Sequence, residues 1–186
     1  MKTTWLGIIG HNGSGKSTIC NYLSTKEFRI LSLSDIPREY ATARNLSHDR
    51  SSLTKLSNEL KATHGLNFFA KKIIQSICLP APRIVFDSIR HPDEIHYLND
   101  FNVKFIGVSA PIEDRFDRIK SRKNSTDHVT FEQFKAHDDY ESKGTSSGQH
   151  INDCLNLCQY TIQNNADQSQ LFRNVDTLLE QFLTPS

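Results

Sequence analysis

The chain has 186 residues, with 22 Lys and Arg against 21 Asp and Glu, and its formal net charge is +1. This length predicts a single domain, 1–186, around one core, and the near-neutral charge excludes a field strong enough to indicate a nucleic-acid or membrane partner by itself. No run is apolar enough to cross a bilayer and the four cysteines lack CxxC spacing, so we expect reduced thiols in a cytoplasmic protein, monomer or homodimer.

A buried strand over residues 4–9 leads into residues 10–18, GHNGSGKST, which have the G-x-x-x-x-G-K-[ST] form of a phosphate-binding loop. Its glycines allow successive backbone N–H groups to turn inward around a polyphosphate. Lys16 is expected to reach the terminal phosphates and Ser17 to bind Mg²⁺ at the start of a helix, whereas His11 should point away. The predicted ATP-binding residues are Asn12, Gly13, Ser14, Gly15, Lys16, Ser17 and Thr18. The alternative is a glycine-rich turn without nucleotide, against which the lysine, the hydroxyl and the flanking elements all argue.

A second strand is predicted over residues 27–33, and a helix begins after it with Ser34 and Asp35 as capping residues. Asp35 and Arg38 therefore follow the carboxyl end of a strand, where open parallel sheets bind their ligands. The alternative is a capping aspartate beside a solvated arginine. Apolar residues at helical spacing then predict two helices within residues 48–79.

Residues 83–87, RIVFD, form the third predicted strand, which ends in Asp87. An aspartate that ends a buried strand beside a phosphate-binding loop can hold a Mg²⁺-bound water, and the alternative is a simple helix cap. Arg90 follows at the same edge. A helix is expected from Pro92, whose ring suits a first helical turn.

After a fourth strand over residues 103–109, a helix is predicted to place Ile112, Phe116 and Ile119 in the core and three arginines on an adjoining face. These arginines are Arg115, Arg118 and Arg122. Such a stripe is often only a solvated face, but this one precedes the polar residues 123–149, which we interpret as a mobile lid that contains a Thr130/Gln133 capping box. Residues 35–80 are correspondingly interpreted as an acceptor-binding insertion.

The chain is predicted to close with a short helix over residues 151–157, a strand over 160–162 and an amphipathic helix over 171–183. Strands that alternate with helices predict the α/β class, a three-layer P-loop NTPase fold with helices on both faces of a parallel sheet. The guanine-selecting N-K-x-D motif is absent, which argues against a GTPase switch. Two insertions in a short chain are typical of small-molecule kinases.

Three blocks of the sequence resemble corresponding blocks of nucleotide-kinase-like proteins: LSDIPRE at 33–39, FDSIRHPDEI at 86–95 and RFDRI at 115–119. The chain is similar to deoxynucleoside monophosphate kinases, to dephospho-CoA kinase-related archaeal proteins and to the kinase-like domain joined to some deoxycytidylate deaminases. Dephospho-CoA kinases carry paired aspartates after strand two, where Asp35 stands alone. The resemblance implies that Arg38 holds the acceptor phosphate and that Arg90 is a second acceptor-side arginine.

This family implies in-line transfer of the ATP γ-phosphoryl group to a small phosphorylated acceptor, most directly a nucleoside monophosphate. Lys16 and the backbone of residues 13–18 would hold the donor, and Arg115 would contribute to nucleotide binding. Ser17 and Asp87 would organise Mg²⁺. Arg115, Arg118 or Arg122 would neutralise the migrating group as the lid closes. Two alternatives remain open: a dephospho-CoA kinase-like enzyme, and a regulatory protein in which ATP orders the lid for a partner.

Overall fold

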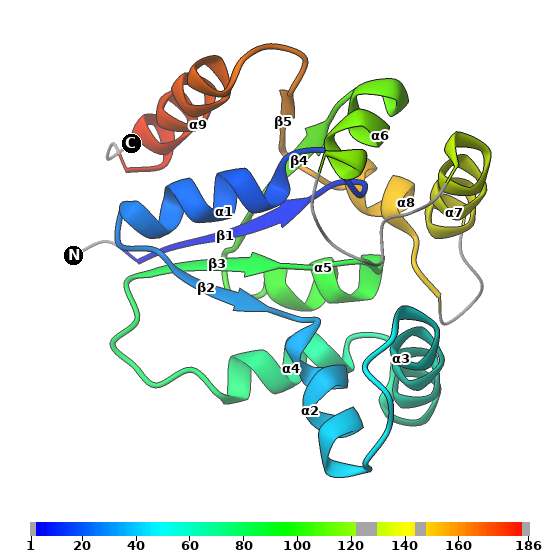
Figure 1. Cartoon of the computed structure of the whole chain (residues 1–186). Helices are drawn as coiled ribbons and strands as arrows, with labels where there is room; N and C mark the ends of the chain where they lie inside the picture. The colour runs from blue at the N-terminus through cyan, green and yellow to red at the C-terminus, as the bar shows by residue number, and fades with distance from the viewer. Residues whose placement is uncertain (1–2, 122–129, 144–147, 184–186) are drawn as a thin grey trace.

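The computed structural model describes residues 3–121, 130–143 and 148–183. Within them, five parallel strands form one sheet in the order β2-β3-β1-β4-β5, which confirms the predicted α/β fold class (Figure 1). The strands are β1 (Thr4–Ile9), β2 (Arg29–Ser32), β3 (Arg83–Asp87), β4 (Lys104–Ser109) and β5 (Tyr160–Gln163). Because every pairing is parallel, all five carboxyl ends lie at the same edge.

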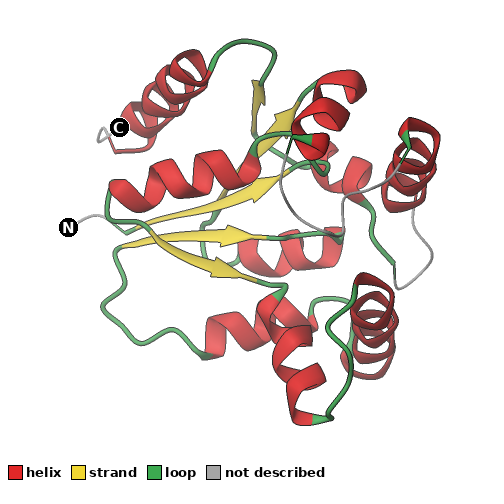
Figure 2. Cartoon of the chain, in the orientation of Figure 1, coloured by secondary structure: helices red, strands yellow, loops and turns green. Residues whose placement is uncertain are grey.

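Helices cover both faces of this sheet (Figure 2). They are α1 (Lys16–Thr25), α2 (Asp35–Ala43), α3 (Arg50–His64), α4 (Phe68–Gln75), α5 (Pro92–Asn99), α6 (Ile112–Lys120), α7 (Phe131–Lys143), α8 (Ile151–Asn156) and α9 (Gln168–Leu183). None of these described helices has the length and apolar character needed to cross a membrane.

Alternate side chains of the strands enter two separate cores, as the period of two in a β-strand requires. Ile8 and Val85 pack with α1 and α9 on one face of the sheet. Ile9 and Phe86 pack with α2, α3, α4 and α5 on the other face. The double burial explains why β1 and β3 read as continuous apolar runs.

Several element ends differ from the predictions for local reasons. Strand β2 begins only at Arg29 because Glu27 takes a positive φ of 64° in the preceding turn. Helix α9 begins at Gln168, three residues early, because the Asp167 carboxylate accepts the backbone N–H of Gln170 at 2.7 Å. Ser34 stands at the N-cap of α2, as predicted, but its side chain makes no capping hydrogen bond.

Glycine at position 7 is required by packing in the sheet. A Cβ atom there would lie 2.5 Å from Phe105 Cδ1 and 3.0 Å from Ile89 Cδ1, whereas one at Gly107 in β4 would lie 3.1 Å from Leu155 Cδ2. We predict that Gly7→Ala lowers the free energy of unfolding by about 1–3 kcal/mol through overpacking. The matched control Gly107→Ala should cost less, as urea denaturation would measure, and equal losses would contradict this packing.

Candidate active site

The phosphate-binding loop connects β1 to α1 and is closed on itself by its own lysine. Lys16 Nζ donates hydrogen bonds to the carbonyl oxygens of Gly10 at 2.7 Å and His11 at 2.8 Å. Gly13 and Gly15 have positive φ angles of 79° and 108°. Both also lie against neighbouring elements, because a Cβ would come within 2.5 Å of the Arg115 carbonyl oxygen or 2.3 Å of Asn164 Nδ2. Only glycine fits at either position.

Two side chains from distant parts of the sequence hold the outer side of this loop. Buried Asn164, which follows β5, donates from Nδ2 to the Ser14 carbonyl oxygen at 2.8 Å. Arg118 of α6 donates to the carbonyl oxygens of Gly13 at 3.4 Å and Asn164 at 2.8 Å. The sequence analysis missed Asn164, for which the only signal was an amide pair at the carboxyl end of a predicted strand. Because the carbonyl oxygens of Gly13 and Ser14 are held on the outer side, the N–H groups of the loop are left to face a ligand.

Lys16 lies in a site that disfavours its charge. Burial, followed by the nearby Arg90 guanidinium, lowers the pKa of Lys16 to about 8, although Asp87 acts in the opposite direction. A polyanion bound at the loop would relieve the repulsion between these cations. The site is therefore electrostatically incomplete without an anion.

Asp87 ends β3 beside the loop, as predicted. Its Oδ2 accepts a hydrogen bond from Ser88 Oγ at 3.2 Å, whereas Oδ1 is buried and has no hydrogen-bond partner among the described residues. Ser17 lies exposed in the first turn of α1. A carboxylate and a hydroxyl are the hard oxygen donors that Mg²⁺ takes, directly or through water, so the orphaned oxygen fits a metal-bound water.

A cavity of about 420 Å³ opens from Lys16 toward α2 and α3. Its wall carries more cations than anions. The cations are Lys16, Arg38, Arg50, Lys61 and Arg90, and the anions are Glu94 and Glu141. Lys61 pairs with Glu94 at 3.0 Å and Arg50 pairs with Glu141, which leaves Lys16, Arg38 and Arg90 in excess.

The two predicted acceptor arginines both line this cavity. Arg38 uses Nη1 to reach Ser34 Oγ at 2.6 Å and Asp35 Oδ1 at 3.5 Å, and its side chain is half exposed. Arg90 uses Nη1 to donate to Gln149 Oε1 at 2.6 Å. Among the described residues, no other nitrogen of either guanidinium is hydrogen-bonded, so each retains donors for a phosphate.

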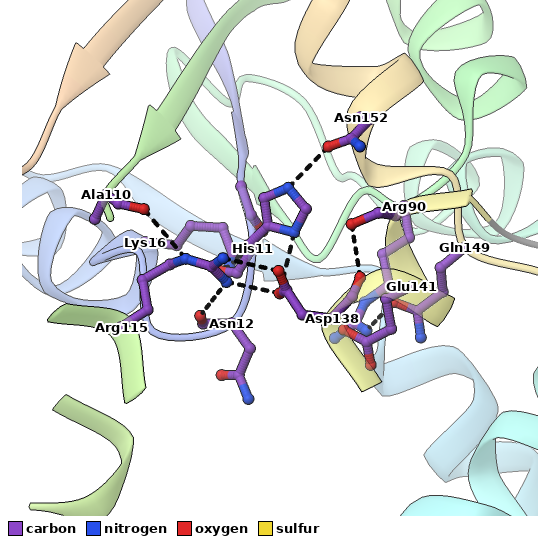
Figure 3. A network of polar contacts seen from close by, with 12 residues as sticks. His11, Asn12, Lys16, Arg90, Ala110, Arg115, Asp138, Glu141, Gln149 and Asn152 are labelled. Atoms are coloured by element: carbon purple, nitrogen blue, oxygen red, sulfur yellow. Dashed lines mark hydrogen bonds and ion pairs between the residues drawn. The ribbon is translucent and has the colours of Figure 1, made fainter. Parts of the chain in front are cut away.

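The lid arginines are placed differently from the prediction. Arg115 is buried rather than on an adjoining face, and it donates from Nη1 and Nη2 to Asp138 of α7 at 2.6 and 2.7 Å (Figure 3). Ile112 and Phe116, predicted in the core, are half-buried, whereas Ile119 is buried. The pattern failed because α7, which the sequence does not assign to this face, covers Arg115. Arg122 lies outside the described residues.

His11, which was given no role, joins this network. Its Nδ1 lies 3.3 Å from Asp138 Oδ1 and its Nε2 lies 3.0 Å from Asn152 Oδ1 (Figure 3). Burial alone would raise the pKa of Asp138, but the two hydrogen bonds from Arg115 and the neighbouring His11 ring outweigh burial and hold that pKa well below its ordinary value. Asp138 therefore stays ionised and fastens α7 to the phosphate-binding loop.

We predict that Asp138→Asn lowers the free energy of unfolding at pH 7 by about 1–3 kcal/mol, because buried Arg115 loses its charged partner. A depressed folded-state pKa contributes stability that is present above the unfolded-state pKa and lost as pH falls toward the folded one. The difference from wild type should therefore hold between pH 7 and 5 and shrink below about pH 4. Urea titrations at each pH measure it, and a pH-independent difference would contradict the ionised pair.

Comparisons with known proteins agree with this architecture. A family model described as an AAA domain matches residues 6–139. A UPF0200 protein of Thermococcus kodakarensis is 26% identical over 184 residues, which cover 95% of this chain and 97% of the relative. The Thermus thermophilus protein TT1252 superposes with a TM-score of 0.65 at 20% identity over both whole chains. A shikimate kinase of Bacteroides thetaiotaomicron gives a TM-score of 0.63 at 14% identity over 97% and 99% of the two chains. The fold is that of the P-loop kinases.

Proposed function

The chain belongs to the AAA-domain family, and from this premise we propose that it transfers the γ-phosphoryl group of ATP to a small phosphorylated acceptor. The excess of Lys16, Arg38 and Arg90 in one cavity carries the proposal. Among the described residues, a neutral hydroxyl acceptor would leave Arg90 without an acidic partner and Arg38 with only the exposed Asp35 carboxylate at 3.5 Å. A phosphate can take a forked hydrogen bond from each arginine. A (deoxy)nucleoside monophosphate is the acceptor that the resemblance of the sequence blocks favours.

In this mechanism, residues 13–18 and Lys16 hold the donor phosphates, and Arg38 and Arg90 hold the acceptor phosphate in line with them. Arg118 and Arg122 neutralise the charge that develops on the migrating group. Arg115 keeps α7 on the phosphate-binding loop through Asp138, and it meets the nucleotide only where that pair opens. Glu141 of α7 lines the cavity, so this helix would help to exclude water from the transfer.

Ser17 and Asp87 would hold Mg²⁺. The ion, when bound, supplies positive charge between the donor phosphates and lowers the cost of charge in the transition state. The buried Oδ1 of Asp87, which has no hydrogen-bond partner among the described residues, would accept from water bound to such an ion. No side-chain nucleophile is needed, because the acceptor phosphate itself attacks.

A nucleotide-responsive binding protein is the second candidate. This candidate is favoured by Arg115, whose guanidinium already has protein partners and is not free for a nucleotide. Its Nη atoms donate to Asp138 and its Nε donates to the Ala110 carbonyl oxygen at 3.2 Å. Such a protein would hydrolyse ATP slowly whatever acceptor is offered.

The test is acceptor dependence. ADP formation by wild type should require a nucleoside monophosphate or dephospho-CoA, and Lys16→Ala should reduce transfer by about a hundredfold or more, since a contact to the migrating group is lost. Slow hydrolysis that no acceptor accelerates would select the second candidate.

Within that assay, Arg38→Ala and Arg90→Ala should each lower acceptor kcat/KM by about ten- to a hundredfold, because each removes a charge-assisted contact. ATP affinity by calorimetry should change little. The control Arg44→Ala removes an arginine that follows α2 outside the cavity and pairs with Glu59 at 2.8 Å, and it should leave both values unchanged. An equal fall in ATP affinity would move Arg38 and Arg90 to the donor site.

Nucleotide binding should also take up a proton near pH 8. Lys16 has a pKa of about 8 in the free protein, and a bound polyphosphate raises that pKa by favouring the ammonium form. Calorimetry at pH 8 in buffers of different ionisation enthalpy should report uptake of roughly half a proton, which declines at pH 6.5. Lys16→Arg stays charged and is the control; the same uptake in that variant would contradict Lys16 as the source.

A further inference from the structure

We propose that three serine hydroxyls form a relay that couples the acceptor arginine Arg38 to the metal-binding carboxylate of Asp87. The relay consists of Ser34, Ser32 and Ser88. It rests on the proposed function, to which it adds a physical link between acceptor binding and the metal site. We assign the three serines as positioning residues, because they act on Asp87 and not on a reacting atom.

The relay is continuous from one end to the other. Arg38 Nη1 donates to Ser34 Oγ at 2.6 Å, and Ser34 Oγ lies 2.9 Å from Ser32 Oγ. Ser32 Oγ donates to Ser88 Oγ at 3.1 Å, and Ser88 Oγ donates to Asp87 Oδ2 at 3.2 Å. The parallel pairing of β2 with β3 makes this possible, because it sets Ser32 directly opposite Asp87.

The direction of the relay is fixed by counting protons. A serine hydroxyl has one hydrogen to donate. Ser88 gives its hydrogen to Asp87 and Ser32 gives its own to Ser88, so Ser34 must donate to Ser32. Ser34 can do so because it accepts from Arg38. Every hydroxyl therefore donates toward the carboxylate, an arrangement in which successive hydrogen bonds strengthen one another.

Two features of the serines indicate more than satisfaction of polar groups. Ser88 is held at a positive φ of 63°, an unfavourable conformation for a residue with a side chain. Ser34 stands at the N-cap of α2, yet its hydroxyl is absent from the helix cap and serves the relay. Ser88 thus keeps an unfavourable backbone conformation and Ser34 forgoes a helix-capping hydrogen bond, and both residues belong to the relay.

The consequence for function follows from Arg38. When an acceptor phosphate engages this guanidinium, its donation to Ser34 weakens, and the hydroxyls donate less strongly to Asp87. The carboxylate then interacts more strongly with the hydration shell of a metal ion at the phosphate-binding loop. Binding of the acceptor should therefore tighten the metal site through the serines, apart from any direct attraction between phosphate and metal.

A double-mutant cycle on metal affinity tests the relay without turnover. The affinity for Mn²⁺ in the presence of ADP is measured by electron paramagnetic resonance in wild type, Arg38→Ala, Ser32→Val and the double variant. Arg38→Ala should change this affinity by a factor that differs at least about threefold between the wild-type and Ser32→Val backgrounds. Ser32→Thr, which has the shape of valine but keeps the hydroxyl, should behave as wild type, and Ser76→Ala controls for loss of a hydroxyl bonded only to its own helix.

The relay is overturned if Arg38→Ala changes the Mn²⁺ affinity by factors that agree within about twofold in the wild-type and Ser32→Val backgrounds. It is also overturned if the Ser32→Thr protein behaves like Ser32→Val. Circular dichroism and thermal melting show whether each variant is folded. The cycle needs only binding of ADP and Mn²⁺, so it remains decisive where wild type transfers no phosphoryl group and the proposed function fails. If wild type transfers a phosphoryl group to an acceptor but the two substitutions act additively on Mn²⁺ affinity, the relay is overturned and the proposed function stands.

Discussion

The backbone of the phosphate-binding loop is held from outside, and the remainder of the site depends on that constraint. Gly13 lies against the backbone of Arg115 and Gly15 against the side chain of Asn164. Arg118 and Asn164 take the loop carbonyl oxygens at Gly13 and Ser14. Residues from β4–α6 and from the end of β5 thereby fix a loop that lies between β1 and α1. Since the order β3-β1-β4-β5 brings these segments together, the sheet topology itself defines the anion site.

Helix α7 connects the two sides of this edge by charge. Asp138 binds Arg115 next to the phosphate-binding loop, and three residues later Glu141 binds Arg50 at the start of α3. Both carboxylates are nearly buried, and a spacing of three places them on one helix face. The pairs cancel charge that would otherwise compete with Lys16, Arg38 and Arg90. The cavity therefore presents the excess positive charge of its wall beside Lys16 of the phosphate-binding loop.

Local patterns predicted the parts of this molecule that local physics determines. The phosphate-binding loop, the β3 strand that ends in Asp87 and the Thr130/Gln133 capping box all depend on neighbouring residues, and each is present. The partners of Arg115 and of the Ser14 carbonyl lie 23 and 150 residues away in sequence. No periodicity encodes such pairs. A stripe of arginines on a helix has the same sequence pattern whether it faces water or, as for Arg115, a carboxylate on another helix.

Arg115 and Arg118 contribute differently to the site because they have different hydrogen-bond partners. Arg115 places Nε on a carbonyl oxygen and both Nη atoms on Asp138, so the pair is close to neutral and contributes position rather than field. Arg118 binds only carbonyl oxygens among the described residues, so its full positive charge remains beside Gly13. A phosphoryl group leaving the loop would thus move through the field of Arg118 and Lys16 toward that of Arg38 and Arg90. Because Arg118 also holds the loop in place, its charge is fixed beside Gly13. In the proposed transfer, a preorganised charge of this kind would stabilise the transition state at no further cost in reorganisation.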